Sequence, residues 1–477
     1  MGGTRPAVSN PSGMERAEAE VIYDAGREAV VALLLRLDER VSELERRLGQ
    51  HSRNSSTPPS QDPPGAPPRK QALVSPRARG AQPGHPGRGR ALMSADAVDR
   101  VVEHWPWRCG CGHLFEADER EPVGRPARHQ VAELPEIAVE VIEHRLMRLR
   151  CSGCGGHTRA ELPADVPRGA FGPRLQAAVA TLAVRNRVSR RDMVELLGEL
   201  FGCRLATGTI DAIVQRAGGA LEEPQARLAD HVRFASVVNI DETGWRLRGG
   251  KRTLWGALTE RAALFRIAPD RHEREARAML GEEFRGIACS DRWWAYNYLD
   301  PGRRQVCLSH LIRDFPAQSE GLELEKSFGE AGLEIAGRLF QAWHDFQTDG
   351  DRAQLRERVA PLQVELKTLL ERCAGKQPKY KRSRGLARNL LKVWPALWTF
   401  TETDGVEPTN NRAERGLRGA VIYRKLSLVS QSEAGEQTIE RLLSASQTCS
   451  LQRRSLFAYL TAVLAANTRG DPVPSLV

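Results

Sequence analysis

The stretch Ser236-Val-Val-Asn-Ile-Asp-Glu-Thr-Gly-Trp245 decides the fold expected for this chain. Its apolar first half, up to Ile240, predicts a short buried strand, and Asp241 places a carboxylate at the C-terminal end of that strand. Apolar runs predict four further strands, at 253–258, 262–267, 286–290 and 305–308. A helix is predicted after Pro269, and the fourth strand again leads into an acid, Asp291.

Three strands, a helix and two more strands, in this order, are typical of the ribonuclease-H-like fold, which belongs to the α/β class. In that fold the first and fourth strands are parallel neighbours, so their C-terminal ends lie together. We therefore expect Asp241 and Asp291 to face each other. Two adjacent carboxylates repel unless a cation lies between them, and hard oxygen ligands suit Mg²⁺ or Mn²⁺.

A third acid, Glu414, lies in Pro408-Thr-Asn-Asn-Arg-Ala-Glu-Arg415, which has the Pro and Asn signals of a helix start. Three carboxylates can hold two metal ions that assist the displacement of an oxygen at phosphorus. Each acid also has a purely structural interpretation. Asp241 can cap a strand end, and Asp291 can cap a helix. Glu414 can pair with Arg418, four residues on.

Composition limits the remaining possibilities. The chain has 477 residues, enough for roughly three domains, and its net charge of +10 favours a polyanionic partner. Its uncharged apolar runs, such as 29–35 and 456–466, are shorter than the roughly 18 residues that span a bilayer. We expect no membrane segment and no signal peptide, and therefore a cytoplasmic protein.

The N-terminal region divides into a helix and a linker. Apolar residues from Val30 to Leu48 follow the alternating steps of a coiled-coil seam, so a leucine-rich helix is predicted within residues 1–52. It either self-associates or docks on the protein's own body. Residues 53–98 are rich in Pro, Gly and basic side chains and predict a linker. Its arginines, including Arg88 and Arg90, either bind DNA phosphates or only keep a connecting tether in solvent.

Two cysteine knuckles predict a zinc-ribbon-like module at residues 99–165. The candidate zinc ligands are Cys109, Cys111, Cys151 and Cys154. Alternating apolar residues through Val139, Val141 and Leu146 predict a strand between the knuckles. The first knuckle has one intervening residue, which strains chelation by both sulfurs, so His113 or His104 can replace a thiol. The alternative is two unrelated cysteine pairs.

Residues 166–230 are predicted to be helical. A break at Gly202 precedes a second helix that opens near Thr207, the outline of a helix-turn-helix DNA-binding region. The same outline fits an ordinary helical hairpin, so DNA contact and simple packing both stay open here.

Taken together, these motifs resemble those of the DDE transposases of the insertion-sequence-66 family. The resemblance covers most of the chain and is carried by motifs in family order: Asn54–Pro59, Gly80–His85, the two cysteine knuckles, Asp241–Thr243, Asp291 with its aromatic tail, Cys307–His310 with Arg313 and Phe315, and Asn410–Arg415. It implies that Asp241, Asp291 and Glu414 are the catalytic triad. It also implies a catalytic domain at 231–430 with a helical insertion at about 320–401. A helical region is expected at 431–477.

The resemblance implies supporting roles for His310, Arg313 and Asn411. We expect His310 to cap the helix after the fifth strand, because imidazole is not a typical ligand beside magnesium. The family's first knuckle has two intervening residues, so this chain departs from the family at the zinc module. That departure leaves the catalytic interpretation intact.

Basic residues in the insertion and around Glu414 are the expected DNA contacts. In the insertion these are Lys379, Lys381, Arg382 and Arg384. Beyond them, Trp394 and Trp398 have helical spacing and are interpreted as core. Around the third acid, Arg412, Arg415 and Arg418 either hold phosphates of the scissile strand or pair with acids on a solvated face.

The resemblance implies a bacterial transposase acting on the nucleoid. Such an enzyme binds terminal inverted repeats, frees 3′ hydroxyl ends and joins them to target DNA with two Mg²⁺ or Mn²⁺ ions, and a structural zinc ion completes the expected cofactors. Its expected partners are double-stranded DNA, further copies of itself and possible accessory proteins of the same element. The alternative is a catalytically inactive or repurposed DNA-binding regulator. A structure-specific nuclease of the same fold is a third reading.

Overall fold

The computed structural model describes residues 16–35, 41, 91–319, 323–375, 381–427 and 430–477. The chain divides into two compact units. The larger unit contains His144–Met193 and Ala206–Val477, and the smaller contains the described part of Pro68–Glu143 together with Val194–Leu205. The predicted acids all belong to the larger unit.

A five-stranded mixed sheet lies at the centre of the larger unit, in the order β5-β4-β3-β6-β7. Its strands are β3 (Val237–Leu247), β4 (Gly250–Leu258), β5 (Ala263–Ala268), β6 (Ile287–Ser290) and β7 (Arg304–Val306). Helix α7 (Glu273–Leu280) separates the third strand from the fourth, as predicted. β3 and β6 are parallel neighbours, with Val237 opposite Ile287, so this expectation is confirmed.

The expectation that the first strand ends at Asp241 is wrong, because β3 continues to Leu247. Beyond Asp241 the strand pairs antiparallel with β4, and a tight turn at Arg248 and Gly249 joins the two. Both turn residues have positive φ, 47° and 84°, the conformation that such hairpin turns require. The parallel pairing with β6 extends only to Asn239, so Asp241 still lies just beyond that paired segment.

Helix α14 (Glu433–Leu451) covers the free edge of β5. Three of its side chains, one per turn, accept the backbone N–H groups of this strand. Thr448 accepts from Ala263, Ser444 from Phe265 and Glu440 from Ile267, at 2.8–3.0 Å. The edge strand therefore has no free donors at these positions to pair with another chain. Burial raises the pKa of Glu440 to about 7.

Further helices surround the sheet in the larger unit. They are α3 (Pro173–Val184), α5 (Thr207–Gly219), α6 (Glu222–Arg233), α13 (Asn411–Ser427) and α15 (Leu456–Arg469). Helix α5 begins where the sequence predicted it, and α4 (Arg190–Phe201) precedes the Gly202 break. The helical character of 166–230 and 431–477 is therefore confirmed, whereas DNA contact by α5 stays a prediction.

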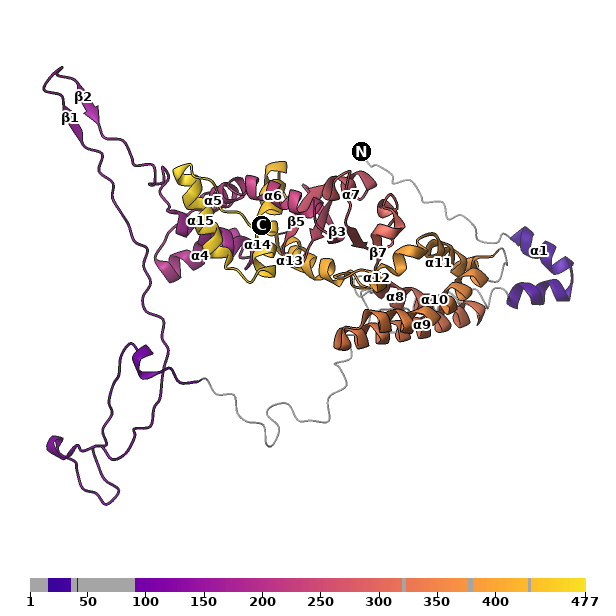
Figure 1. The fold of residues 1–477 in the computed structure, drawn as a ribbon, viewed down its shortest axis with the longest axis horizontal. Coiled ribbons are helices and arrows are strands. Elements are labelled where there is room, and N and C mark those ends of the chain that lie inside the picture. Colours follow the sequence, from indigo (N-terminus) through magenta and orange to yellow (C-terminus); the bar gives the residue numbers. More distant parts are fainter. Residues whose placement is uncertain (1–15, 36–40, 42–90, 320–322, 376–380, 428–429) are drawn as a thin grey trace. The chain divides into compact units, whose positions relative to one another are not determined.

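The predicted insertion is helical and packs on the sheet (Figure 1, orange). Its helices are α9 (Glu323–Asp349), α10 (Arg352–Ala374), α11 (Lys381–Lys392) and α12 (Thr399–Glu402), and α8 (Leu311–Ser319) comes just before it. One hydrophobic core joins them to Cys289 of β6 and Val306 of β7. Trp398 is buried in this core and Trp394 packs against it, so the interpretation of both as core residues is confirmed.

The regions before residue 166 contain little regular structure among the described residues. Helix α1 (Arg16–Asp24) is followed by helical residues 27–35, and most of the predicted leucine-rich seam lies outside the described residues. The prediction of a strand through Val139 and Val141 is wrong, because these residues form no strand and both side chains are exposed. A short hairpin forms instead from β1 (Arg148–Arg150) and β2 (His157–Arg159). Within the described chain, no helix is both long and apolar enough to cross a membrane.

Candidate active site

Asp241 and Glu242 are consecutive residues of β3, so their side chains point to opposite faces of the sheet. Asp241 is half-buried on the face that carries Asn239, against which the start of α13 packs. Glu242 is 8% exposed on the other face. One strand therefore supplies two acids, and only Asp241 lies on the side of α13.

Asp291 directly follows β6 and is held in a tight turn. Its Oδ1 accepts a hydrogen bond from the backbone nitrogen of Trp293 at 2.8 Å. Its backbone carbonyl accepts one from Nη2 of Arg304 at 2.7 Å. The capping interpretation of Asp291 is thus partly correct, because one carboxylate oxygen stabilises the turn and the other makes no such contact among the described residues.

Arg304 is buried and stabilises this turn by hydrogen bonds. Its side chain is 1% exposed and donates to Oγ of Ser290, the carbonyl of Tyr296 and Oδ1 of Asn297 in addition to Asp291. Burial lowers the pKa of Arg304 to about 10, and the charge of Asp291 opposes that shift. No carboxylate forms an ion pair with it in the described chain, so the guanidinium is used to shape the turn that carries Asp291.

Glu414 lies in the first turn of α13, as predicted. The residue that fixes this helix start is Asn410, which is 2% exposed. Its Nδ2 donates to the carbonyl of Ile240 at 2.8 Å, and its Oδ1 accepts from Nδ2 of Asn239 at 3.0 Å. The side chain of Asn410 therefore ties the start of α13 to the strand residues immediately before Asp241.

Gly416 allows α13 to lie close to β4. A Cβ at this position would lie 2.2 Å from Cδ2 of Leu258. A side chain here would force Leu258 to change its conformation or the helix to shift. The glycine therefore allows α13 to pack closely on β4 beside Leu258.

The three predicted acids influence one another electrostatically. Burial, together with the charges of Glu242, Asp291 and Glu414, raises the pKa of Asp241 to about 8. Asp291 and Glu414 thus lie close enough to Asp241 to disfavour its ionised form. A cation among these carboxylates would remove that repulsion.

Glu242 belongs to a second network that the sequence did not reveal. Its carboxylate accepts hydrogen bonds from the phenol of Tyr296 and from Nε of Arg271, the latter at 3.1 Å. Burial raises the pKa of Glu242, and the Asp291 charge adds to the shift, whereas both hydrogen bonds oppose it. The only sequence signal for this network was the position of Glu242 beside Asp241.

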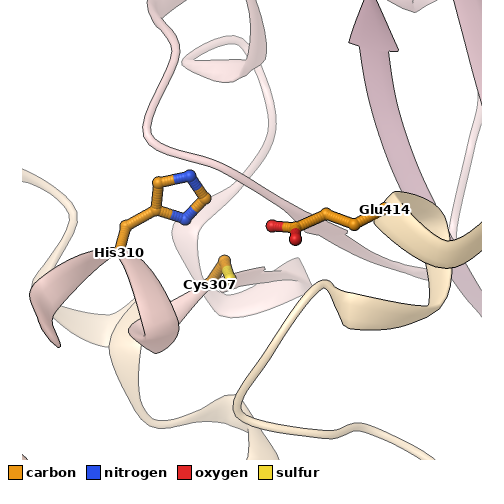
Figure 2. A group of neighbouring side chains, drawn as sticks. All are labelled: Cys307, His310 and Glu414. Atoms are coloured by element: carbon orange, nitrogen blue, oxygen red, sulfur yellow. The ribbon is translucent and has the colours of Figure 1, made fainter. Parts of the chain in front are cut away.

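Glu414 has two further neighbours, Cys307 and His310. Figure 2 shows the His310 ring and the Glu414 carboxylate pointing toward each other, with Cys307 beside them. One potential ligand atom from each of the three lies within 4.8 Å of the others, so this group could hold a metal ion. His310 makes no capping hydrogen bond in the described chain, and its buried Nδ1 lacks a partner there. The expectation that His310 serves as a cap is therefore not supported.

The protonation states of Cys307 and His310 favour neutral groups in the metal-free protein. Burial raises the pKa of Cys307, whose Sγ accepts from the backbone nitrogen of Asn410 at 3.1 Å. Burial lowers the pKa of His310, and the charge of the exposed Arg313 lowers it further. A neutral imidazole is the form that binds metal ions.

The predicted DNA contacts differ in how far the structure describes them. Arg415 and Arg418 are exposed on α13 and have no ion-pair partner among the described residues, whereas Arg412 lies 3.6 Å from Glu407. The suggested Glu414–Arg418 pair is absent from the described ion pairs. Lys381, Arg382 and Arg384 belong to α11, whose start coincides with the predicted basic run. Arg88, Arg90 and Lys379 lie outside the described residues, and Asn411 is the first residue of α13.

The four candidate zinc ligands lie in two short turns. Cys109 and Cys111 are in the smaller unit, where the backbone nitrogen of Cys109 donates to the carbonyl of His113 at 2.8 Å. Cys151 and Cys154 are in the larger unit, in the β1–β2 hairpin. All four are free thiols, and zinc binding by them stays a prediction.

Comparison with known proteins gives two family matches and two relatives. A family described as "Transposase IS66 family" matches residues 168–438, and a family of unknown function (DUF6444) matches residues 4–91. The uncharacterized protein y4jD of Sinorhizobium fredii is 25% identical over 71% of this chain and 72% of its own length. The uncharacterized protein y4hP of the same organism is 25% identical over 77% of this chain and 72% of its own length.

Proposed function

Because the chain belongs to the IS66 family of transposases, we propose that it cuts DNA at the ends of a bacterial insertion sequence and joins the freed 3′ ends to target DNA. The observation that carries this proposal is the electrostatic proximity of Asp241, Asp291 and Glu414, which come from β3, the end of β6 and the start of α13. Three acids from distant segments lie near enough for the charges of Asp291 and Glu414 to act on Asp241, and none of them has an ion pair among the described residues. Such an arrangement costs stability and is typical of a functional site.

The sheet supports a ribonuclease-H-like catalytic core. Its strand order, with the first strand between the second and the fourth, places the part of β3 just before Asp241 beside the end of β6. The helix that carries the third acid packs against β3, and the helical insertion enters before that helix. This topology is what the proposed catalytic domain requires.

The acids fit divalent cations. The carboxylates of Asp241, Asp291 and Glu414 form a hard oxygen donor set, and the raised pKa of Asp241 reports a repulsion that positive charge would relieve. When bound, two Mg²⁺ or Mn²⁺ ions would activate the attacking oxygen and stabilise the leaving oxygen of the phosphodiester. Asp241, Asp291 and Glu414 would supply the protein ligands, and Asn410 and Arg304 would keep those ligands in place.

The same site serves cutting and joining, because water and a 3′ hydroxyl are both oxygen nucleophiles that attack phosphorus. Arg415 and Arg418 lie one and four residues after Glu414 on an exposed part of α13, so they are suited to hold phosphates of the strand being cut. The basic run at the start of α11 is a second candidate contact with DNA phosphates. Paired action on two element ends implies that two or more copies of the chain work together.

The decisive experiment uses purified protein and labelled duplexes that carry the element ends flanking its gene. A transposase nicks these ends in Mn²⁺, joins them to a plasmid target, and does neither in EDTA. A regulator derived from such an enzyme binds the ends and leaves them intact under both conditions. A nuclease of the same fold cuts duplexes of unrelated sequence equally well and joins nothing.

A further inference from the structure

Two tryptophans follow Asp291, and one of them is exposed beside the acids. Trp294 has 47% of its surface exposed, whereas the next two residues, Ala295 and Tyr296, are fully buried. An exposed tryptophan is a large apolar surface, and such surfaces often mark binding sites. It begins η4 (Trp294–Tyr296), the short helix formed directly after the Asp291 turn. The buried members of this helix, Ala295 and Tyr296, already serve the core, so packing does not account for Trp294.

The surroundings of Trp294 hold its ring in a defined place. Its ring centroid lies 5.9 Å from that of Trp293 and 5.6 Å from that of His272, at interplanar angles of 44° and 41°. Trp293 in turn donates from Nε1 to the carbonyl of Arg271 at 3.1 Å. The indole of Trp294 is therefore supported from two sides and partly open to solvent.

This group is connected to the acids through Arg271. The guanidinium carbon of Arg271 lies 4.4 Å from the centroid of the Trp293 ring, and its Nε donates to Glu242, the neighbour of Asp241. Trp293 is also bonded through its backbone nitrogen to the Asp291 carboxylate. We call Arg271, His272, Trp293 and Trp294 the tryptophan shelf. It presents an aromatic face beside the Arg271 guanidinium, which is ion-paired with Glu242.

We propose that the Trp294 ring stacks on a nucleobase of the bound DNA that leaves the duplex beside the scissile phosphate. The inference rests on the proposed function, because that function places a phosphodiester at the acids. Trp294 is the third residue after Asp291, so their Cα atoms are at most about 10 Å apart, which corresponds to about three base steps along a strand. Exposed aromatic rings next to positive charge are the features that bind unpaired bases, irrespective of base identity.

A photocrosslinking experiment tests the shelf without requiring cleavage. Full-length protein is bound, with Ca²⁺ in place of Mg²⁺, to element-end duplexes that carry 5-iododeoxyuridine at single positions within three nucleotides of the cut. One position is expected to crosslink to Trp294, located by mass spectrometry of the digested protein. Trp294→Ala should abolish this crosslink and Trp294→Phe should retain it. Phe234→Ala removes an aromatic ring that is 88% exposed at the end of α6 and serves as the matched control, with no effect expected.

Cleavage in Mg²⁺ gives a second readout. Trp294→Ala should slow nicking of fully paired ends about tenfold, since base stacking on an aromatic ring has that order of effect. A mismatch at the crosslinked position supplies the unpaired base in advance and should recover most of the rate. A Trp294→Ala variant that nicks paired ends at the wild-type rate, or a wild-type protein that crosslinks at no tested position, overturns the proposal.

The two proposals fail in different ways. Crosslinking at Trp294 by a protein that never cuts DNA would overturn the proposed transposase activity and keep the shelf as a base-binding site. DNA cutting without any crosslink at Trp294 would support the transposase activity and overturn the proposal that Trp294 binds a base. If Trp294→Ala changes the oligomeric state and leaves crosslinking unchanged, the shelf is a contact between copies of the chain and the proposal is wrong.

Discussion

The side-chain amide of Asn410 donates a hydrogen bond to the backbone carbonyl of Ile240 at 2.8 Å. These residues are 170 positions apart in the chain, yet Ile240 immediately precedes Asp241 and Asn410 lies four residues before Glu414. A single buried amide therefore sets the spacing between the first and third acids. The oxygen of the same side-chain amide accepts a hydrogen bond from Nδ2 of Asn239, so the amide has a defined orientation in the network.

We expect Asn410→Ala to weaken both the fold and the site. The substitution leaves the buried carbonyl of Ile240 and the amide of Asn239 without these partners, which should cost about 1–3 kcal/mol of unfolding free energy. Cleavage should fall further than this loss explains, because Glu414 is no longer tied to β3. Chemical denaturation and nicking assays on the same preparation measure the two effects. Asn467→Ala, at an exposed position of α15, is the control. Equal activity in both variants would contradict this role of Asn410.

Arg304→Met should destabilise the turn that carries Asp291. Met fills a similar space but donates no hydrogen bonds, so Ser290, Asn297 and the backbone carbonyls of Asp291 and Tyr296 lose their donor. We expect a loss of roughly 3 kcal/mol in unfolding free energy and a higher Mg²⁺ requirement for nicking. The exposed neighbour Arg303 provides the control as Arg303→Met, which should be close to wild type. A normal Mg²⁺ requirement in a folded Arg304→Met protein would show that the turn positions Asp291 without Arg304.

The pKa of Asp241 predicts how stability depends on pH in metal-free protein. This pKa rises from 3.8 in the unfolded chain to about 8 in the folded one, so the folded state holds a proton that the unfolded state has released. Stability from this group is complete below about pH 4 and is lost as the pH rises toward 8. Asp241→Asn removes this dependence. In EDTA, the variant should therefore gain a few kcal/mol relative to wild type between pH 5 and pH 8.

Thermal unfolding at several pH values measures this difference, and added Mg²⁺ provides the second arm. Mg²⁺ favours ionised Asp241, so at pH 8 it should raise the melting temperature of wild type and have little effect on Asp241→Asn. A stability difference that does not change between pH 5 and pH 8 would contradict the electrostatic account of the site.

Cys307, His310 and Glu414 predict sensitivity to a soft metal ion. A thiol, an imidazole and a carboxylate within 4.8 Å suit Cd²⁺ better than Mg²⁺. Cd²⁺ bound there would occupy Glu414, so it should inhibit Mg²⁺-dependent nicking. Cys307→Ala should raise the inhibitory Cd²⁺ concentration about tenfold or more. Inhibition that is the same in the variant and in wild type would show that Cys307 binds no metal ion.

The strands and the parallel pairing of the first with the fourth could be predicted from local patterns, whereas the network around the predicted acids could not. The strands have their own apolar periodicity, and the start of α13 has capping signals. Asn410 and Asn411 look equivalent in the sequence, and only the position of β3 distinguishes them. His310 precedes the helical insertion and Glu414 follows it, and the fold brings the two side chains together. Their spacing of about a hundred residues in the sequence does not predict this contact.

The errors have equally specific causes. The end of the first strand was misplaced because Asp241 and Glu242 interrupt the apolar run, while the turn at Arg248 and Gly249 continues the pairing beyond them. The strand expected through Val139 and Val141 has the right alternation but no partner face on which to bury its apolar side chains among the described residues. In both cases tertiary pairing, and not local pattern, determined the outcome.

The most direct test of the account is strand transfer by variants of the three acids. Asp241→Asn, Asp291→Asn and Glu414→Gln are each compared with wild type in end binding, nicking and joining to a plasmid target in Mn²⁺. The account predicts that each variant binds element ends about as tightly as wild type and neither nicks nor joins them. Joining at a wild-type rate by any one of these variants would contradict the assignment of that acid to the catalytic site.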